Sequence, residues 1–344
     1  MKYIVNWKIG IVIGFSLLVT IIGLLYASFF APNLNINGEH KQYIYVYPNQ
    51  SWDDVLVSLH EMDAILCASS FKLAVQLKYA STPPQSGKYD IEPNLSNRYL
   101  LNRITHGLQS KIILRLVSAR STEKVASNLS KQLMVDSTSL ITHFLDSTLL
   151  EKYDLTLANS LCLFVPFSTE ITWDVEIDTI MFLIEKEYQT FWNESRLSLA
   201  KKIKLSPTEI HTLASIVEEE TNDFEDKKTV AGLYINRLRK GMPLQADPTV
   251  RYAIGNFEIN RILKKHLLVD SPFNTYIYEG LPPSPIRIPS KESINAVLHY
   301  TKHSYIFMCA KPDFSGTHDF SRTFQEHMRK ARAYQRQLNK RGIF

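Results

Sequence analysis

The sequence predicts an α+β protein with a single N-terminal membrane-spanning helix. Three observations support this fold class: a long apolar segment at the start, strand and helix patterns that follow one another without an internal repeat, and clear helix caps in the last third. The chain has 344 residues, of which 45% are hydrophobic and 21% are charged. This composition is typical of a folded globular protein, and the length allows two or three domains.

The apolar segment covers residues 9–30, IGIVIGFSLLVTIIGLLYASFF, and contains no charge. As a helix it would be about 33 Å long, enough to cross a bilayer core of about 30 Å. A cleaved signal peptide would have a shorter apolar core of roughly 7–15 residues, followed by a small-residue cleavage site. Because Lys2 and Lys8 precede the segment and no basic residue follows closely, we expect residues 1–8 in the cytoplasm and the remaining chain across the inner membrane.

Charge and cysteine content argue against several classes of function. Without the two N-terminal lysines, the formal net charge of +5 falls to +3 for residues 31–344. No basic block typical of nucleic-acid binding occurs, so we expect no nucleic-acid partner. Cys67, Cys162 and Cys309 are widely spaced and form no CxxC pair, so we interpret them as buried small hydrophobic residues. We expect no metal and no cofactor.

The chain after the anchor divides into a linker and three regions: 31–42 as the linker, 43–118, a connecting helical region at 119–205, and a C-terminal α+β domain at 206–344. Within the first region, YIYVY at 43–47 and SGKYDI at 86–91 alternate like strands, and two helical patterns lie between them. Ser51 is the expected cap of the first of these helices. This β-α-α-β order resembles a small carbohydrate-binding LysM module, and a generic α+β spacer is the alternative.

Three consecutive glutamates end a helix that begins in the C-terminal domain. SPTE at 206–209 is a capping box with proline at the first helical position. At about 100° per residue, Glu220 continues the apolar face of this helix, Glu218 lies on its flank and Glu219 points away, so we interpret Glu219 as solvated. A carboxyl beside an apolar face can acquire a raised pKa through desolvation and act as a general acid. Periodicity leaves Glu218 and Glu220 as equal candidates, and helix-end or ion-pair roles as the alternative.

Later loops contain polar and aromatic side chains of the kind that bind sugars. The segments are LQADPTV at 244–250, SPFNTYIYEGLPPSPIRIP at 271–289 and THDF at 317–320. Sugar hydroxyls need hydrogen-bond donors and acceptors, and pyranose faces pack on aromatic rings. Each segment also has a purely structural interpretation. In particular, Asp247 precedes Pro248 and is a candidate helix cap.

Together, LASIVEEET, INRLRKGMPLQADPTV, SPFNTYIYEGLPPSPI and HDFSRTFQEH resemble the motifs of the endolytic murein transglycosylase family, also called YceG-like. The resemblance runs from about Leu213 to Phe324. It implies a catalytic domain that cuts nascent peptidoglycan strands internally, without water, and leaves 1,6-anhydro-N-acetylmuramic acid ends. It also implies work alongside peptidoglycan synthases. The first acid of the family's V-E-x-E-T motif corresponds to Glu218, which is therefore the expected catalytic residue, with Glu220 in support.

The same resemblance implies seven further residues that shape the substrate cleft: Asn236, Gln245, Asp247, Thr249, Asn274, Tyr276 and His318. One acid is enough when the 6-hydroxyl of the muramoyl sugar is the nucleophile, because ordinary glycosidases use their second carboxyl to attack or to activate water. LFVPFSTE lacks the usual Pro-Asp-Thr-Tyr and Ser284 replaces a common glycine, so we assign no substrate contact to the loop at 163–170. The rival functions are a non-catalytic peptidoglycan-binding scaffold and a hydrolytic muramidase with Asp247 as second carboxylate.

Overall fold

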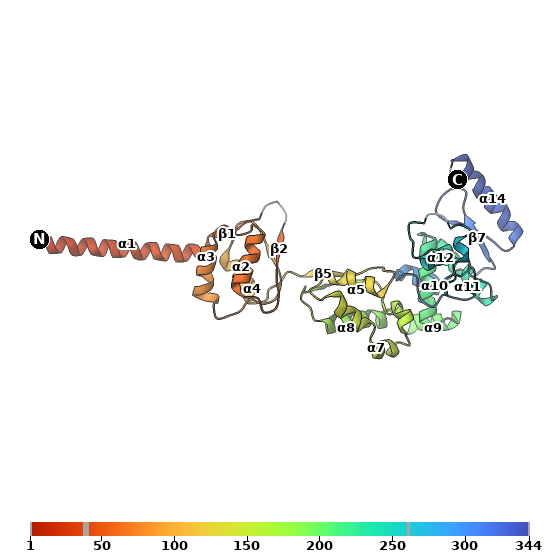
Figure 1. Cartoon of the computed structure of the whole chain (residues 1–344), viewed down its shortest axis with the longest axis horizontal. Helices are drawn as coiled ribbons and strands as arrows, with labels where there is room; N and C mark the ends of the chain where they lie inside the picture. Colours follow the sequence, from red (N-terminus) through yellow and green to blue (C-terminus); the bar gives the residue numbers. More distant parts are fainter. Residues whose placement is uncertain (1, 37–40, 260–261, 343–344) are drawn as a thin grey trace. The chain divides into compact units, whose positions relative to one another are not determined.

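The computed structural model describes residues 2–36, 41–259 and 262–342, and the chain divides into two compact units (Figure 1). Unit 1 consists of Met1–Ile113 and Glu170–Val175, and unit 2 consists of Leu114–Thr169 and Glu176–Phe344. Both units combine helices with short two-stranded sheets. The mixed class of helices and strands predicted from the sequence is therefore confirmed.

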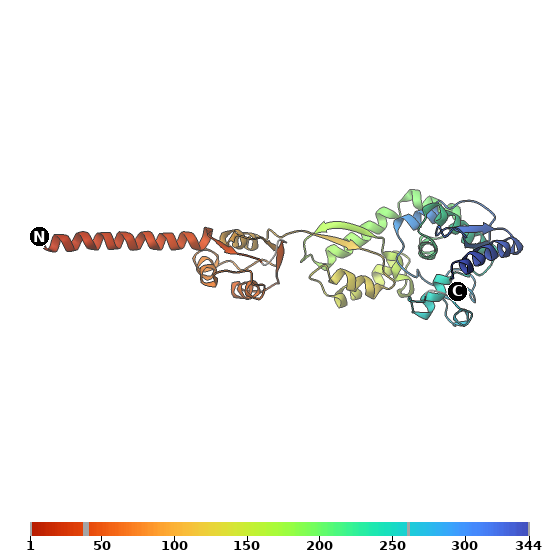
Figure 2. The ribbon, with the colours of Figure 1, turned by 90° about the horizontal axis from the view of Figure 1, so that it is seen from above.

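Unit 1 begins with the long helix α1 (Lys2–Phe30), drawn in red in Figures 1 and 2. Its segment Ile9–Phe30 has a mean hydropathy of 2.5 and is long and apolar enough to cross a membrane. The other elements of this unit are β1 (Pro32–Leu34), β2 (Gln42–Val46), α2 (Trp52–Glu61), α3 (Ala68–Ala74), the π-helical turn η1 (Val75–Tyr79), β3 (Gly87–Ile91), β4 (Leu95–Ser96) and α4 (Asn97–Thr105).

The β-α-α-β order expected at 43–91 is present in unit 1. Strand β2 pairs antiparallel with β3, with Ile44 opposite Tyr89, and both side chains are buried. Ser51 caps α2 as predicted, because its hydroxyl accepts from the Asp54 amide while the Asp54 carboxylate accepts from the Ser51 amide. Phe71 of α3 completes the same apolar core.

The remaining helices and one two-stranded sheet belong to unit 2. In that sheet β7 (Phe307–Ala310) pairs antiparallel with β8 (His318–Ser321). Strands β5 (Ile112–Leu116) and β6 (Phe167–Ile171) pair with each other, and each has residues in both units. The helices are α5 (Thr122–Ser130), α6 (Ser137–Phe144), α7 (Ser147–Lys152), the 3-10 segment η2 (Leu157–Leu163), α8 (Ile177–Phe191), α9 (Glu194–Ile203), α10 (Pro207–Glu220), α11 (Phe224–Arg239), α12 (Asp247–Ile254), the 3-10 turn η3 (His266–Leu268), α13 (Lys291–Leu298) and α14 (Phe324–Lys340).

Helix α10 lies at the centre of unit 2 and carries the three glutamates. It begins with the predicted capping box, in which Ser206 and Glu209 exchange hydrogen bonds and Pro207 takes the first helical position. It packs against α11 and α13, and residues 210–217 are all buried. The first turn, with Glu209 exposed, and the last turn, Glu218 to Glu220, both reach the surface of the unit. The last turn is the part that carries the three glutamates.

The three cysteines have three different environments, which corrects their common interpretation as buried residues. Cys162 is buried in η2, Cys309 is half-buried in β7, and Cys67 is exposed. Cys67 occupies the position just before the first turn of α3, where its side chain is outside the helix and away from the core. The widely spaced pattern in the sequence did not contain this information.

His211 of α10 is completely buried, and neither ring nitrogen has a hydrogen-bond partner among the residues that the structure describes. Burial lowers the pKa of His211 to about 3, because the charged ring would lose its hydration. The folded protein therefore keeps this ring neutral over the whole mildly acidic range. An unfolded chain takes up the proton near its ordinary pKa of about 6.5.

We expect acidification from pH 7 to pH 5 to lower the free energy of unfolding by about 2 kcal/mol through His211 alone. The contribution is complete above pH 6.5 and is lost progressively down to about pH 3, because the unfolded state binds the proton first. Guanidinium titrations of the full chain in detergent at the two pH values measure it. His211→Leu should shrink this pH dependence, and His299→Gln, at an exposed position, should retain it. Equal pH dependence in the wild type and His211→Leu would contradict the expectation.

Candidate functional site

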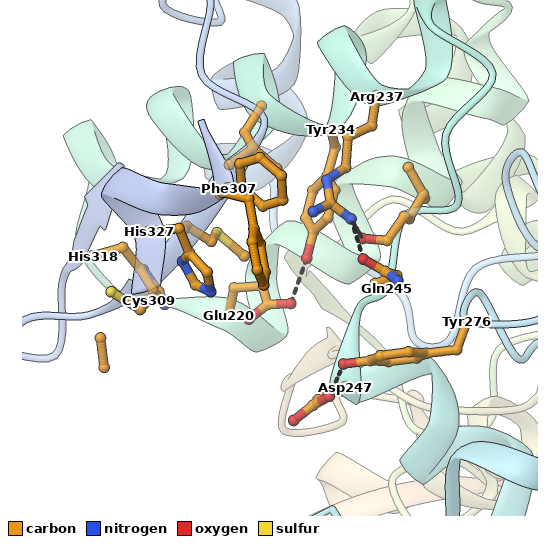
Figure 3. Close-up of a pocket in the computed structure, with 15 residues that line it drawn as sticks. Glu220, Tyr234, Arg237, Gln245, Asp247, Tyr276, Phe307, Cys309, His318 and His327 are labelled. Carbon is orange, nitrogen blue, oxygen red and sulfur yellow. Dashed lines mark hydrogen bonds between the residues drawn. The ribbon is translucent and has the colours of Figure 1, made fainter. Parts of the chain in front are cut away.

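Glu220, the last residue of α10, lines a cavity of about 340 Å³ (Figure 3). This volume falls within the range of roughly 300–1,000 Å³ that is usual for small-molecule sites. The walls come from α10, α11, the turn before α12, the loop that contains Tyr276, the β7–β8 sheet and the start of α14. The polar lining residues are Glu220, Tyr234, Arg237, Gln245, Asp247, Tyr276, Cys309, His318 and His327. Acidic, basic, amide and phenolic groups therefore meet in one cavity.

The environment of Glu220 favours its protonated form. Burial raises the pKa of this carboxyl, and the hydrogen bond from Tyr234 and the charge of His318 offset only part of the effect. Tyr234 Oη donates to Glu220 Oε1 at 2.6 Å, as the dashed line in Figure 3 shows. A carboxyl whose pKa is raised toward neutrality can donate a proton and later recover it, which is the property of a general acid-base group.

Asp247 and Tyr276 form a second polar pair in the cavity (Figure 3). Tyr276 Oη donates to Asp247 Oδ1 at 2.6 Å. The interpretation of Asp247 as a helix cap is therefore wrong: Ala246 holds the cap position of α12, and the Asp247 side chain bonds Tyr276 instead. The negative charge of Asp247 also contributes to the raised pKa of Glu220, so the two carboxyls interact electrostatically.

Arg237 fixes the side of the cavity that carries Gln245. Its guanidinium is buried, and Nη1 donates at 3.0 Å to the carbonyl oxygens of Pro243 and Leu244 and to Gln245 Oε1. Nε donates to the carbonyl of Ile306 at 2.7 Å. In the sequence Arg237 resembles an ordinary basic residue in the last turn of a helix. Its spacing of three residues from Tyr234, which puts both on one face of α11, was the signal that could have placed it here.

His318 is held by Asp226, a residue that the sequence analysis missed. His318 Nδ1 lies 2.7 Å from Asp226 Oδ2, and the His318 amide donates to Oδ1 at 3.1 Å. Burial opposes the charge of the imidazole, but the hydrogen bond and charge of Asp226 outweigh it, and Glu220 adds to them, so the pKa of His318 is raised. In the sequence Asp226 resembles an ordinary acidic residue in the first turn of a helix.

The cavity brings together five of the residues expected in the site: Glu220, Gln245, Asp247, Tyr276 and His318. Two others support it from within the fold. Thr249 and Asn274 are completely buried: Thr249 Oγ1 pairs with the Thr275 hydroxyl at 2.8 Å, and the Asn274 amide donates to the Val269 carbonyl at 2.8 Å. These bonds hold the loop that presents Tyr276.

Asn236 lies outside the lining of this cavity. Its amide nitrogen donates to the carbonyl oxygens of His303 at 2.8 Å and Tyr305 at 3.1 Å. It therefore ties α11 to the segment that enters β7, and its contribution to the cavity is the position of that strand.

Glu218 faces a different cavity, of about 630 Å³. Its Oε2 accepts from the Ser290 amide at 2.6 Å and from the Ser290 hydroxyl at 2.7 Å. Ser290 is the cap of α13, so Glu218 fixes the start of that helix. This second cavity also contains Glu187, Lys291 and residues 166–168 of the loop to which no substrate contact was assigned.

Glu219 is not solvated, which corrects the interpretation from periodicity. Its side chain is only 10% exposed and accepts from Arg120 Nη2 at 2.8 Å and from Arg287 Nη1 at 2.5 Å. Helical spacing correctly turns Glu219 away from the apolar face of α10. The segments that precede α5 and α13 cover that side and supply the two arginines.

Comparisons with known proteins identify relatives of this chain. The sequence profile of the YceG-like family matches residues 44–333. The chain is 38% identical over 161 residues to a Bacillus subtilis protein named endolytic murein transglycosylase, and 33% identical over 138 residues to a Streptococcus pneumoniae protein of the same name. These matches cover 47% and 39% of this chain and 44% and 24% of the relatives, so the matched part is less than half the length of either relative.

A solved structure gives the likeness at the level of the fold. The crystal structure of a YceG-like protein from Listeria monocytogenes aligns with a TM-score of 0.57 at 25% sequence identity. The alignment covers 85% of this chain and 99% of that one. The likeness therefore extends beyond the part of the chain that contains the three glutamates.

Replacement of Arg237 by methionine should destabilise the protein by about 3 kcal/mol or more. The change keeps much of the side-chain volume but leaves the buried Leu244 carbonyl, two part-buried carbonyls and the Gln245 amide oxygen without their donor, and a buried group left unsatisfied costs about 1–3 kcal/mol. Denaturant unfolding of the full chain measures the change. Arg239→Met, at an exposed position on the same helix, should cost less than about 1 kcal/mol. Equal losses in both variants would contradict the role of Arg237.

Proposed function

We propose that this chain, which belongs to the YceG-like family, is a lytic transglycosylase that cuts peptidoglycan between N-acetylmuramic acid and N-acetylglucosamine. The observation that carries the proposal is a carboxyl of raised pKa, Glu220, in a cavity lined by aromatic rings and hydrogen-bonding groups. Sugar hydroxyls and pyranose faces fit such a lining. The names of the two bacterial relatives support the same substrate and the same endolytic reaction.

We assign the acid-base role to Glu220, and this departs from the assignment of Glu218 by motif. Two observations favour Glu220: it shares its cavity with Gln245, Asp247, Tyr276 and His318, and burial raises its pKa. The cavity at Glu218 contains none of the other expected site residues. Glu218 is also already engaged as the acceptor of two hydrogen bonds at the start of α13.

In the proposed reaction, protonated Glu220 donates its proton to the glycosidic oxygen as the bond from this oxygen to C1 of the muramoyl sugar breaks. The 6-hydroxyl of the same sugar then attacks C1 and gives its proton to the Glu220 carboxylate. The products are a free 4-hydroxyl on the departing strand and a 1,6-anhydro ring, and no water is consumed. Because the nucleophile is part of the substrate, its effective concentration is high and one carboxyl serves both steps.

The neighbours of Glu220 suit the charge changes in this reaction. Tyr234 donates to Oε1 and so leaves Oε2 to exchange the proton with the sugar. The raised pKa of His318 favours its cation, which stabilises the Glu220 carboxylate after the first step. The Asp247 carboxylate, held by Tyr276, supplies negative charge for the positive character that develops at C1.

The apolar helix and the β-α-α-β part of unit 1 are consistent with an enzyme that acts on peptidoglycan close to a membrane. We assign Ile9–Phe30 as the inner-membrane anchor, with Lys2 and Lys8 on the cytoplasmic side and the Glu220 cavity on the other side. There the cavity meets newly made strands, and peptidoglycan synthases are the expected neighbours. The β-α-α-β part of unit 1 is assigned as a LysM-like region that contacts glycan.

Glu220→Gln should lower kcat/KM on purified glycan strands by about 10²–10⁴-fold, because glutamine keeps the size of the side chain but cannot exchange the proton. Glu218→Gln and Glu219→Gln are the matched controls and should retain most of the activity, since their carboxyls bond Ser290 and the two arginines outside the cavity. Mass spectrometry of the new strand ends gives the rates. Loss of activity in Glu218→Gln with normal turnover in Glu220→Gln would restore the assignment by motif.

The same strand ends distinguish the rival functions. A transglycosylase gives anhydro ends, a hydrolytic muramidase adds one water and gives reducing ends, and a binding scaffold releases no new ends. Reducing ends from the wild type would make Asp247, in the same cavity as Glu220, the candidate base for water. Absence of new ends with a folded wild-type protein would refute catalysis.

Asp226→Asn should move the basic limb of the pH profile of kcat/KM to higher pH. The substitution removes the charge that raises the pKa of His318, so the cation that lowers the pKa of Glu220 is lost at a lower pH. His318→Gln should give the same shift, and the double variant should add little to either. Asp223→Asn is the control because asparagine also caps α11. An unshifted limb in Asp226→Asn would leave Asp226 with a purely structural role.

A further inference from the structure

Helix α14 carries a large share of the charge of the chain. Residues 324–341 contain six basic residues and one acidic residue, so their net charge is +5. The formal net charge of the whole chain is also +5, and all other residues therefore balance to zero. Such a concentration of one sign of charge on one helix attracts anionic ligands.

Four basic residues of α14 share one exposed face: Arg329, Arg332, Arg336 and Lys340. At about 100° per residue they fall within an arc of about 80°. Among the described residues, the guanidinium groups of Arg329, Arg332 and Arg336 take part in no hydrogen bond and no ion pair. The acidic residue of the helix, Glu326, already pairs with Lys330 at 2.9 Å. The charges on this face are therefore available to a ligand.

The basic face of α14 adjoins the Glu220 cavity. Phe324 lines that cavity and also lines a surface hollow of about 710 Å³, which includes Met328 and the three arginines. Its ring lies 5.9 Å from that of Phe307, which belongs to the cavity wall on β7. Figure 1 shows α14 beside β7 in the same unit. A ligand that leaves the cavity past Phe324 reaches the arginines directly.

We propose that the basic face of α14 binds the acidic peptide substituents of the glycan strand that occupies the Glu220 cavity. This inference rests on the proposed function and adds a peptide-binding surface to it. Stem peptides carry free carboxylates, and arginine binds carboxylates through paired N–H donors. The rise from Arg329 to Lys340 is about 17 Å, which matches about five extended peptide residues. The surface would thus favour strands that still carry their peptides.

A peptide ligand explains this face better than contact with a lipid surface. A helix that lies in a membrane interface has large apolar side chains on the side opposite its charges. The side of α14 opposite the arginines packs instead on its own unit, where Tyr334 contacts Phe314 at 5.7 Å between ring centroids and His327 stacks on Phe307. The rings on this side of the helix therefore already contact other parts of unit 2.

The test compares full-length wild type with the triple variant Arg329→Gln/Arg332→Gln/Arg336→Gln on two substrates: purified strands with their stem peptides, and the same strands after amidase has removed them. We expect the KM for peptide-bearing strands to rise about tenfold, as for the loss of three exposed ion pairs, with kcat unchanged. The KM for peptide-free strands should stay the same. Added salt should weaken the wild-type preference for peptide-bearing strands.

The control variant Lys131→Gln/Lys201→Gln/Lys264→Gln removes three exposed charges elsewhere in unit 2 and should behave as wild type. An equal KM rise on both substrates, or no rise on either, would overturn the proposal. So would loss of binding to vesicles of anionic lipid without any change toward strands, which would identify a membrane contact. Binding of peptide-bearing strands to the Glu220→Gln protein, measured with and without the triple substitution, tests the surface separately from catalysis. The triple substitution should weaken this binding.

Discussion

The burial of α10 on nearly every side determines the environment of its three terminal glutamates. Neighbouring carboxyls that point about 100° apart cannot share one environment, and each of the three meets a different part of unit 2. Glu218 holds the start of α13, Glu219 bonds Arg120 and Arg287, and Glu220 enters the cavity. The contacts of the first two lie outside the cavity, and Glu220 is the member of the three whose carboxyl is buried in it with a raised pKa.

The local part of the fold could be predicted from the sequence. The caps Ser51, Ser206 and Asp223 and the helix starts that follow them are present because a cap depends on residues within one turn. The strand pattern at 43–47 likewise depends on the alternation of neighbouring side chains. These signals are short in range, so tertiary contacts do not override them.

The site was predicted less completely, because its chemistry depends on contacts between distant segments. Periodicity puts Glu219 on the side away from the apolar face, but only the fold shows that Arg287 lies on that side and bonds it. Asp247 has the sequence context of a cap, yet its carboxylate accepts a hydrogen bond from Tyr276, 29 residues later. Asp226 and Arg237 have ordinary explanations at helix ends. Asp226 bonds His318, 92 residues later, and Arg237 bonds both the nearby Pro243–Gln245 turn and the Ile306 carbonyl, 69 residues later.

The backbone of Gln245 has a φ of 52°, in the left-handed region that residues other than glycine enter at a cost of about 1–2 kcal/mol. Glycine would adopt this conformation without that cost, but it would remove the amide that lines the cavity and accepts from Arg237. At this position an unstrained backbone would require glycine, whereas the hydrogen bond to Arg237 and the cavity wall require the glutamine side chain. Selection for heat resistance would therefore set relief of backbone strain against a hydrogen bond to the buried Arg237, and a glycine chosen for the backbone alone would leave the cavity with one polar wall missing.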